Sequence, residues 1–271
     1  MRAAPGTRIA YVREAEGINS EIRVMEADGS AARTVPSPPG VHETPAWLPD
    51  GATLGFCCDR DGLKALILWN GQFTRLAAAR EFLDRQPCWS ADGRRIFFSS
   101  NRDGDWEIYT MTAAGTRAER LTESPGVDEA PACSPVDDRI AFVSERDGAR
   151  DLYVMGPDGK SVTRLTQDRA WDGRPAWSPD GKRIAWPSER EGEPAVFITD
   201  ADGKNAQRLT PAGEEAEDPA WSPDGKRIVF TSGRDGFREL YAMDADGKNV
   251  TRLTWERGQL HSPAWSRSRG P

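Results

Sequence analysis

The chain has 271 residues, a net charge of −7 at pH 7, 26 glycines and 20 prolines. A negative net charge disfavours a nucleic-acid-binding protein, which should carry a basic stripe, and no apolar run is long enough to cross a bilayer. Glycine and proline recur at fixed places in a repeated pattern, so they indicate turns and not disorder.

One short sequence recurs along the whole chain. Pro-Ala-Trp-Ser-Pro-Asp-Gly-Lys-Arg-Ile begins at Pro175 and again at Pro219. Counterparts of this proline, at intervals of 42 or 44 residues, are Pro45, Pro87, Pro131 and Pro263. Such a period indicates one structural unit that must stack against copies of itself. We therefore expect residues 1–271 to form a single domain.

The N-terminus enters this pattern in the middle of a unit. Residues 1–6 contain no apolar signal core, so the chain as written is expected to stay in the cytoplasm. Residues 8–12 match the second strand of the repeat and not the first. The first unit therefore lacks its opening strand.

The unit that begins at Pro175 predicts four antiparallel strands, named A to D, over 175–178, 183–188, 195–199 and 207–210. Tight turns with glycine, such as Asp180-Gly181, separate them. Strand B is apolar at successive positions, as expected when both faces of a sheet are covered. A covered four-stranded sheet repeated at this period is a β-propeller blade.

The last unit supplies what the first one lacks. Residues 263–266 match strand A, and the pattern then stops. We predict an all-β fold, a closed six-bladed propeller in which 263–266 complete the blade formed by 8–35, with residues 6 and 266 close together. The other predicted blades cover 45–76, 87–121, 131–165, 175–209 and 219–253.

Tryptophan is the largest repeated apolar side chain of strand A, and we expect it to pack between blades. It occurs at Trp47, Trp89, Trp177, Trp221 and Trp265. The unit at Pro131 departs most from the repeat, because Cys133 replaces the tryptophan and Val136-Asp137-Asp138 replaces the turn with glycine. We expect this blade to be the least protected.

The four cysteines replace small or apolar residues of the repeat and have no metal-ligand spacing. We predict that all four are buried free thiols. They are Cys57, Cys58, Cys88 and Cys133.

The full repeat combines Pro-Ala-Trp-Ser-Pro-Asp-Gly-Lys-Arg-Ile with Ser-x-Arg-Asp-Gly, Leu-Tyr-x-Met-Asp-x-Asp-Gly and Arg-Leu-Thr. It resembles the repeat of TolB-type propellers, also called PD40 or WD40-like repeats, and 7–12 and 262–266 resemble their entry and exit. The resemblance implies a non-enzymatic periplasmic scaffold of the Tol–Pal cell-envelope system. It also implies a protein or peptide partner, among them a peptidoglycan-associated lipoprotein. We expect a monomer with no nucleic-acid partner.

In a propeller, the loops from strand D to the next strand A share one face with the B–C turns. These D–A loops vary most here, and variable loops on a rigid repeat are where binding usually occurs. Their acidic surplus favours a cation or a basic partner, and three tryptophans outside the core positions favour a peptide or a sugar. The residues assigned to this partner-binding face are His42, Glu43, Asp84, Arg85, Trp106, Asp128, Glu129, Trp171, Asp172, Arg174, Glu217, Asp218, Trp255 and His261.

Metal binding and catalysis are weaker alternatives. His42, Glu43 and His261 are the candidate metal ligands, and the acidic residues are candidates for calcium or another divalent cation in the channel. Two histidines are too few for a propeller enzyme of the oligogalacturonate lyase type. The sequence has no Gly-x-Ser-x-Gly and no phosphate-binding glycine loop, so we expect no enzyme and no catalytic residues. A carbohydrate-binding module is the other alternative.

An arginine recurs in the B–C turns. We expect it to form charge-assisted hydrogen bonds to carboxylates or carbonyls of the neighbouring blade. It occurs at Arg60, Arg102, Arg146, Arg190 and Arg234.

Overall fold

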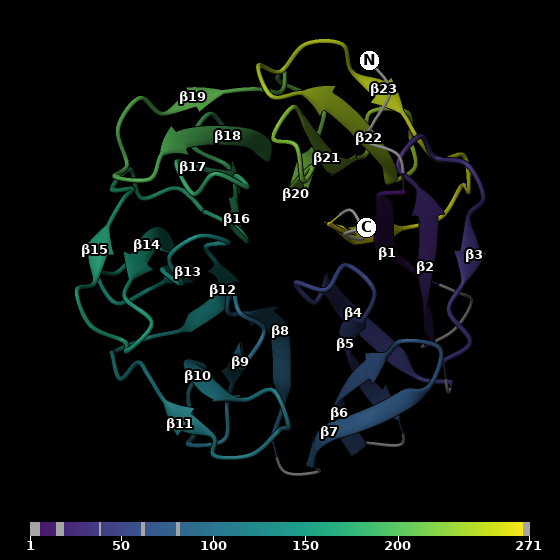
Figure 1. Ribbon diagram of the computed structural model, residues 1–271. Helices are drawn as coiled ribbons and strands as arrows, with labels where there is room; N and C mark the ends of the chain where they lie inside the picture. Colours follow the sequence, from purple (N-terminus) through teal and green to yellow (C-terminus); the bar gives the residue numbers. More distant parts are fainter. Residues whose placement is uncertain (1–5, 15–18, 38, 61–62, 80–81, 268–271) are drawn as a thin grey trace.

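The computed structural model describes residues 6–14, 19–37, 39–60, 63–79 and 82–267. These residues form six four-stranded antiparallel sheets arranged as a ring around a central channel (Figure 1). They contain no helix, and so none that could span a membrane. The predicted all-β, six-bladed propeller is confirmed.

Each sheet is one blade, numbered here in chain order. Blade 1 consists of β24 (Leu260–Trp265), β1 (Arg8–Glu14), β2 (Ser20–Glu26) and β3 (Arg33–Thr34). Blade 2 consists of β4 (Val41–Trp47), β5 (Leu54–Arg60), β6 (Leu63–Trp69) and β7 (Phe73–Ala79). Blade 3 consists of β8 (Asp84–Trp89), β9 (Arg95–Ser100), β10 (Glu107–Thr112) and β11 (Glu119–Arg120).

The second half of the chain repeats this order. Blade 4 consists of β12 (Asp128–Cys133), β13 (Ile140–Ser144), β14 (Asp151–Met155) and β15 (Thr163–Arg164). Blade 5 consists of β16 (Ala176–Trp177), β17 (Arg183–Ser188), β18 (Ala195–Asp200) and β19 (Gln207–Arg208). Blade 6 consists of β20 (Ala216–Trp221), β21 (Arg227–Ser232), β22 (Glu239–Asp244) and β23 (Thr251–Arg252).

The ring closes in blade 1, where the last strand pairs with the first. Ile9 lies opposite Trp265 in the β1–β24 ladder. The Ser266 amide donates to the Arg8 carbonyl at 2.7 Å, and the Arg8 amide donates to the Ser266 hydroxyl at 2.8 Å. The predicted closure, and the proximity of the two ends of the pattern, are confirmed.

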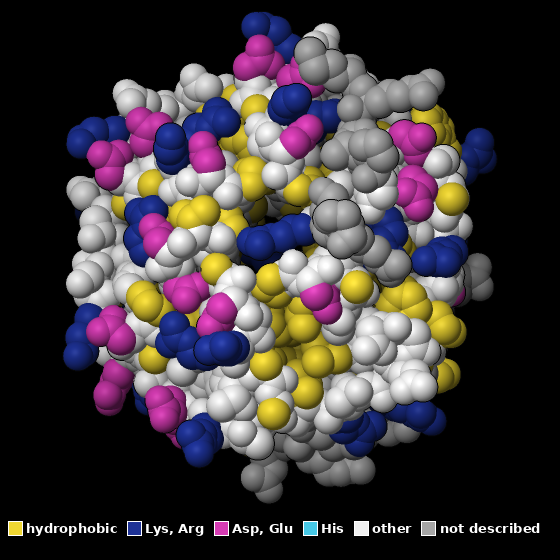
Figure 2. Space-filling view, viewed as in Figure 1, with side chains coloured by type: hydrophobic (Ala, Val, Ile, Leu, Met, Phe, Trp, Pro, Cys, Tyr) yellow, Lys and Arg dark blue, Asp and Glu magenta, His cyan; other side chains and the backbone are white. Residues whose placement is uncertain are grey.

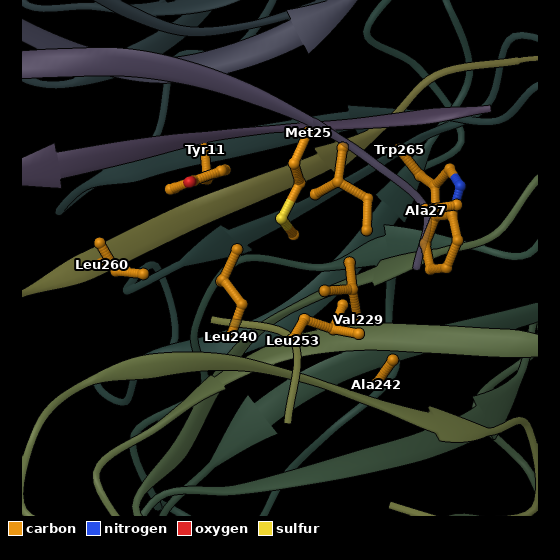
Figure 3. Close-up of a cluster of buried hydrophobic side chains, with 10 residues drawn as sticks. Tyr11, Met25, Ala27, Val229, Leu240, Ala242, Leu253, Leu260 and Trp265 are labelled. Carbon is orange, nitrogen blue, oxygen red and sulfur yellow. The ribbon is translucent and has the colours of Figure 1, made fainter. Parts of the chain in front are cut away.

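The core is divided among the junctions between blades. The described residues form six buried apolar clusters, and each joins two neighbouring blades. Figure 3 shows the junction of blades 6 and 1, where Tyr11 and Met25 lie near Leu240 and Val229. Neither face of a blade meets water, which explains why strand B is apolar at successive positions.

The strand A tryptophans lie between blades, as predicted. The Trp177 Nε1–H donates to the Ala132 carbonyl of blade 4 at 3.0 Å, and that of Trp47 donates to the Ala264 carbonyl at 3.1 Å. The Trp89 ring covers Gly55 of blade 2 so closely that an added Cβ would lie 2.1 Å from it. A side chain at Gly55 would therefore displace this indole.

The prediction of four free thiols is wrong for two of them. Cys88 and Cys133 form a disulfide between strand A of blade 3 and strand A of blade 4. Cys133 occupies the tryptophan position and Cys88 the alanine position of the repeat, so a covalent bond replaces the usual contact of tryptophan with alanine. The stacking of blades 3 and 4 brings these positions within disulfide reach, although 45 residues separate them. Cys57 and Cys58 are buried and free, as predicted.

Most A strands begin earlier than predicted. β8 begins at Asp84 and β12 at Asp128, so residues assigned to D–A loops lie within strands. A register shift interrupts each of these ladders, for example between Arg85 and Cys88. Inside the shift, Gln86 has a φ of 56°, in the left-handed region. This β-bulge lets the strand continue past the proline and was not apparent from the hydrophobic pattern.

Candidate binding face and central channel

The starts of the A strands and the B–C turns lie on the same face, as predicted. Arg102 of a B–C turn contacts Asp84 at 2.8 Å, and Arg146 contacts Asp128 at 2.7 Å. For Arg102 and Arg146 the predicted partner in the neighbouring blade is wrong, because each aspartate belongs to the same blade as its arginine. Strand A runs antiparallel to strand B, so its start lies beside the turn at the end of strand B.

The opposite face carries the A–B and C–D turns. Charges of both signs alternate there, as in the pairs Lys204–Asp202 and Lys248–Asp246. Figure 2 shows such mixed charges around a central hollow with hydrophobic side chains, and no histidine is visible in this view. Both histidines begin A strands, in β4 and β24, and so belong to the partner-binding face.

The three residues that precede the strand A proline of each blade, such as 128–130, are called here the mouth sequence. The first residue of this sequence points into the blade. Asp128 and Asp172 are fully buried, and His42 is 2% exposed. Asp172 accepts hydrogen bonds from the Thr166 hydroxyl at 2.5 Å and the Trp186 Nε1–H at 3.0 Å. Burial raises the pKa of Asp172. These side chains stabilise the fold and are not accessible to a partner.

The second residue of the mouth sequence forms the rim of the channel. Where this residue is a glutamate, it is in most cases ion-paired with an arginine. Glu129 makes ion pairs with both Arg85 and Arg150. Glu217 pairs with Arg238 at 2.7 Å. The rim therefore carries less uncompensated negative charge than composition suggested.

The remaining rim residues lie near the junction of blades 1 and 2. Glu43 is exposed and His261 is half-buried. With His42 and Glu14 they line a cavity of about 290 Å³. The Nδ1 of His42 lies 2.7 Å from the Ser20 carbonyl, so this nitrogen is engaged within the protein.

The candidate metal ligands do not form a compact group. Within the described residues, the group of three whose ligand atoms all lie within 4.8 Å of one another is Asp151, Asp168 and Asp172, at the junction of blades 4 and 5. Arg164 contacts Asp151 at 2.5 Å, and Arg190 contacts Asp168 at 3.0 Å. Guanidinium groups thus already compensate this acidic group.

The three tryptophans of this face differ in exposure. Trp255 is 68% exposed and Trp171 is 37% exposed. Trp106 is half-buried beneath Arg85, whose guanidinium lies 3.7 Å from the ring centroid. The Trp171 ring lies against Gly173. Trp255 and Trp171 therefore offer the accessible aromatic surface, while Trp106 serves mainly to hold Arg85.

Sequence reasoning missed two arginines that shape this face. Arg150 and Arg238 pair with Glu129 and Glu217 of the rim. Both stand just before strand C, at the repeat position that Trp106 occupies in blade 3. Comparison of this position between blades was the signal that would have identified them.

The channel itself is narrow and mostly apolar. It contains a cavity of about 190 Å³, lined chiefly by the proline, alanine and tryptophan of the A strands. Arg174 and Asp218 are its charged lining residues within the described chain. The Cys88–Cys133 disulfide forms part of the wall at the junction of blades 3 and 4, one blade further along the ring from Arg174.

These features define a six-bladed β-propeller with a polar, tryptophan-bearing face around a narrow channel. The chain belongs to the PD40 family, described as the TolB β-propeller domain, whose sequence profile matches residues 2–124 and 116–217.

Curated relatives agree with this assignment. The chain is 36% identical over 129 residues to the Protein TolB homolog of Chlorobium chlorochromatii, covering 46% of this chain and 28% of that protein. It is 31% identical over 130 residues to the Tol-Pal system protein TolB of Desulfosudis oleivorans, covering 46% and 30%. The matched segments thus span less than a third of either relative.

Solved structures agree on the fold over nearly the whole chain. TolB from Acinetobacter baumannii is 27% identical with a TM-score of 0.86, covering 96% of this chain and 66% of that one. A chain of the nidogen/laminin complex is 13% identical with a TM-score of 0.79, covering 98% and 100%. The second likeness shows the fold alone.

Proposed function

We propose that this chain is a non-enzymatic TolB-type propeller that binds a protein or peptide on the face of the D–A loops. The observation that carries the proposal is the exposure of Trp255 and Trp171 beside an ion-paired rim. Large aromatic side chains next to ordered polar groups are typical anchors of protein interfaces.

Family membership suggests the kind of partner. One relative is named as a component of the Tol-Pal system. We therefore propose a cell-envelope partner, with the peptidoglycan-associated lipoprotein as the first candidate. The Cys88–Cys133 disulfide supports a periplasmic location, because disulfides persist in oxidising compartments.

The test is a titration of the purified chain with the peptidoglycan-associated lipoprotein encoded in the same genome. The double variant Trp171→Ala, Trp255→Ala should raise the Kd at least about tenfold, as expected for loss of anchor residues. Phe73→Ala is the matched control, because Phe73 is also exposed but follows a C–D turn on the opposite face. Asp172 is unsuitable for this test, because its removal would disturb a buried network.

Two outcomes would overturn the proposal. One is an unchanged Kd in the double tryptophan variant. The other is an equal loss of binding in Phe73→Ala. A sugar ligand is the alternative that the exposed indoles also suit, and a glycan array with a tryptophan-fluorescence titration distinguishes it from a protein partner.

A divalent cation at the channel mouth remains a separate proposal. The cavity that contains His42, Glu43 and His261 is where it would lie. Elemental analysis of gently purified protein tests it, and a metal content below one ion per chain would reject it.

A further inference from the structure

A chain of hydrogen bonds runs around part of the channel from blade to blade. The third residue of each mouth sequence lies in or beside the β-bulge. The Thr44 hydroxyl accepts the Gln86 amide at 3.1 Å, and the Gln86 side chain accepts the Ala130 amide at 3.0 Å. The Asp218 carboxylate accepts the Ser262 amide at 2.9 Å. In these three junctions, one blade supplies the acceptor for the amide of the next blade.

The chain of hydrogen bonds is broken at blade 5. Ala130 has no side-chain acceptor to offer the next amide, which is that of Arg174. Arg174 itself can only donate, so it offers no acceptor to the following blade. Among the described residues, no hydrogen bond satisfies the amide or the guanidinium of Arg174. Both kinds of donor on Arg174, the amide and the guanidinium, therefore lack an acceptor within the described part of the chain.

The surroundings of Arg174 are mostly apolar, and they leave its charge only partly compensated. Arg174 lines the 190 Å³ cavity among proline, alanine and tryptophan side chains. Burial lowers the pKa of Arg174, and Asp218 is the nearby carboxylate that opposes this effect. The two make no ion pair, and Asp218 is engaged by the Ser262 amide. Arg174 is half-buried. A partly desolvated guanidinium without a hydrogen-bonded partner is stabilised by a ligand that supplies one.

We propose that Arg174 is the receptor for a single carboxylate that enters the channel from the partner-binding face. The guanidinium binds the carboxylate in the two-pronged geometry that this pair favours, and the Arg174 amide contributes a further donor. A chain terminus and an Asp or Glu side chain of a bound protein share this chemistry. The inference rests on the proposed function, which supplies the protein that carries the carboxylate.

The cavity favours a carboxylate over a phosphate for two reasons. Its small volume and its walls of proline and alanine suit a slim planar group. The negative charge of Asp218 also opposes a dianion more strongly than a monoanion. A carboxylate is therefore the acceptor that best matches both the shape and the charge.

The experiment uses small probes, so that it does not depend on the identity of the macromolecular partner. N-acetylglycine represents a chain terminus, and N-acetylglutamate α-amide represents an acidic side chain. N-acetylglycinamide is the uncharged control. Each is titrated into the full chain while the NMR signals of the Arg174 backbone amide and guanidinium Nε–H are followed. At least one carboxylate should shift both signals in a saturable way, whereas the amide control should not. The carboxylate that binds more tightly identifies the source.

Variants distinguish a receptor from a structural arginine. Arg174→Gln should weaken carboxylate binding at least about tenfold, as expected for loss of hydrogen bonds to a charged group. Arg174→Lys keeps the charge and should lose less. Asp218→Asn should tighten binding, because it removes the opposing charge and still accepts the Ser262 amide. Arg169→Gln removes an equally charged, exposed residue of the same D–A loop and should change nothing.

Three results would overturn the inference. They are absence of any shift at Arg174, equal binding of N-acetylglycinamide, and unchanged binding in Arg174→Gln. If the tryptophan variants bind the lipoprotein with an unchanged Kd, the proposed function is rejected. That result would not alter these small-probe titrations. The two failures can therefore be told apart.

Discussion

Two junctions of the channel wall, between blades 3 and 4 and between blades 5 and 6, use the same repeat positions in different ways. Between blades 3 and 4, the Cys88–Cys133 disulfide joins the A strands, and Gln86 accepts the Ala130 amide. Between blades 5 and 6, a tryptophan contact joins the strands. Arg174 lines the channel, and no acceptor for it is found among the described residues. The junction of blades 3 and 4 is fixed by a covalent bond, while the junction of blades 5 and 6 retains polar groups that a ligand can satisfy.

The two junctions also differ in what holds the neighbouring blades together. Trp221 of blade 6 packs into the cluster that contains Ala185 and Ile198 of blade 5. Arg183 stacks on this indole, with its guanidinium 4.8 Å from the ring centroid. Between blades 3 and 4 there is no such indole, and the covalent bond takes its place. The contribution of each kind of junction to the free energy of unfolding can be measured with variants.

The largest expected effect is at the junction of blades 5 and 6. Trp221→Ala should lower the free energy of unfolding by about 3–5 kcal/mol, because it leaves a cavity between two blades. The measurement is a denaturant titration. Trp255→Ala is the control, since Trp255 is exposed, and it should change stability by no more than about 0.5 kcal/mol. A similar loss in both variants would contradict the assignment of Trp221 to the junction.

Loss of the disulfide should have the next largest effect. The double variant Cys88→Ala, Cys133→Ala should be less stable by about 2–4 kcal/mol, the usual range for opening a native cross-link. A reductant should destabilise the wild type to a similar extent. It should have no effect on the double variant, which is the matched control. Equal sensitivity of both proteins to the reductant would show that this bond is not the stabilising feature.

The tyrosines give a pH-dependent prediction. Burial raises the pKa of all four tyrosines, and a hydrogen bond to a carboxylate raises it further. The pKa of Tyr241 is raised to about 12. An unfolded tyrosine releases its proton near pH 10. Because the folded chain keeps these protons to higher pH, stability should be unaffected below about pH 10 and should fall as pH rises above it.

Ultraviolet absorbance of tyrosinate checks this directly. Little tyrosinate should form near pH 10 while the protein remains folded, and it should appear together with the loss of circular dichroism at higher pH. Tyr241→Phe, which removes the group hydrogen-bonded to Asp235 at 2.5 Å, should reduce the dependence on pH. Ordinary titration of all four residues in the folded protein would contradict the described contacts.

A smaller effect concerns local motion. Blade 4 was predicted to be the least protected because its repeat is degenerate, and this stays a prediction. Its A–B turn has Asp137 where other blades have glycine, and the left-handed residue comes one position later, at Asp138 with a φ of 58°. Hydrogen exchange should be fastest in β13 and β14, and the difference should grow when the disulfide is reduced. Equal protection in all blades under both conditions would count against it.

The sequence specified the fold more completely than the site. The period of the prolines predicted the number of blades and the closure by residues 263–266, because both follow from counting copies of one unit. It did not predict the disulfide, since Cys88 and Cys133 meet only when neighbouring blades stand side by side. It also missed the bulges, because a left-handed residue such as Gln86 leaves no mark on a hydrophobic pattern.

The candidate site was predicted as a face and not as a set of available side chains. Many of the residues assigned to it lie at the starts of the A strands, but Asp128 and Asp172 point into their blades. Whether a side chain faces the blade, the rim or the channel changes from one residue to the next along the strand. A single sequence could not fix that alternation across a bulge. It therefore could not distinguish Arg174, which lines the channel, from Asp172, which is buried.

The most direct test of the whole account is a hydrogen-exchange footprint of the chain with the peptidoglycan-associated lipoprotein bound. We expect protection in the segments 167–175, 213–219 and 255–262, which carry Trp171, Arg174, Asp218 and Trp255. We expect no change in the A–B turns at 179–182 and 223–226. Protection confined to those turns, or spread evenly over both faces, would contradict it.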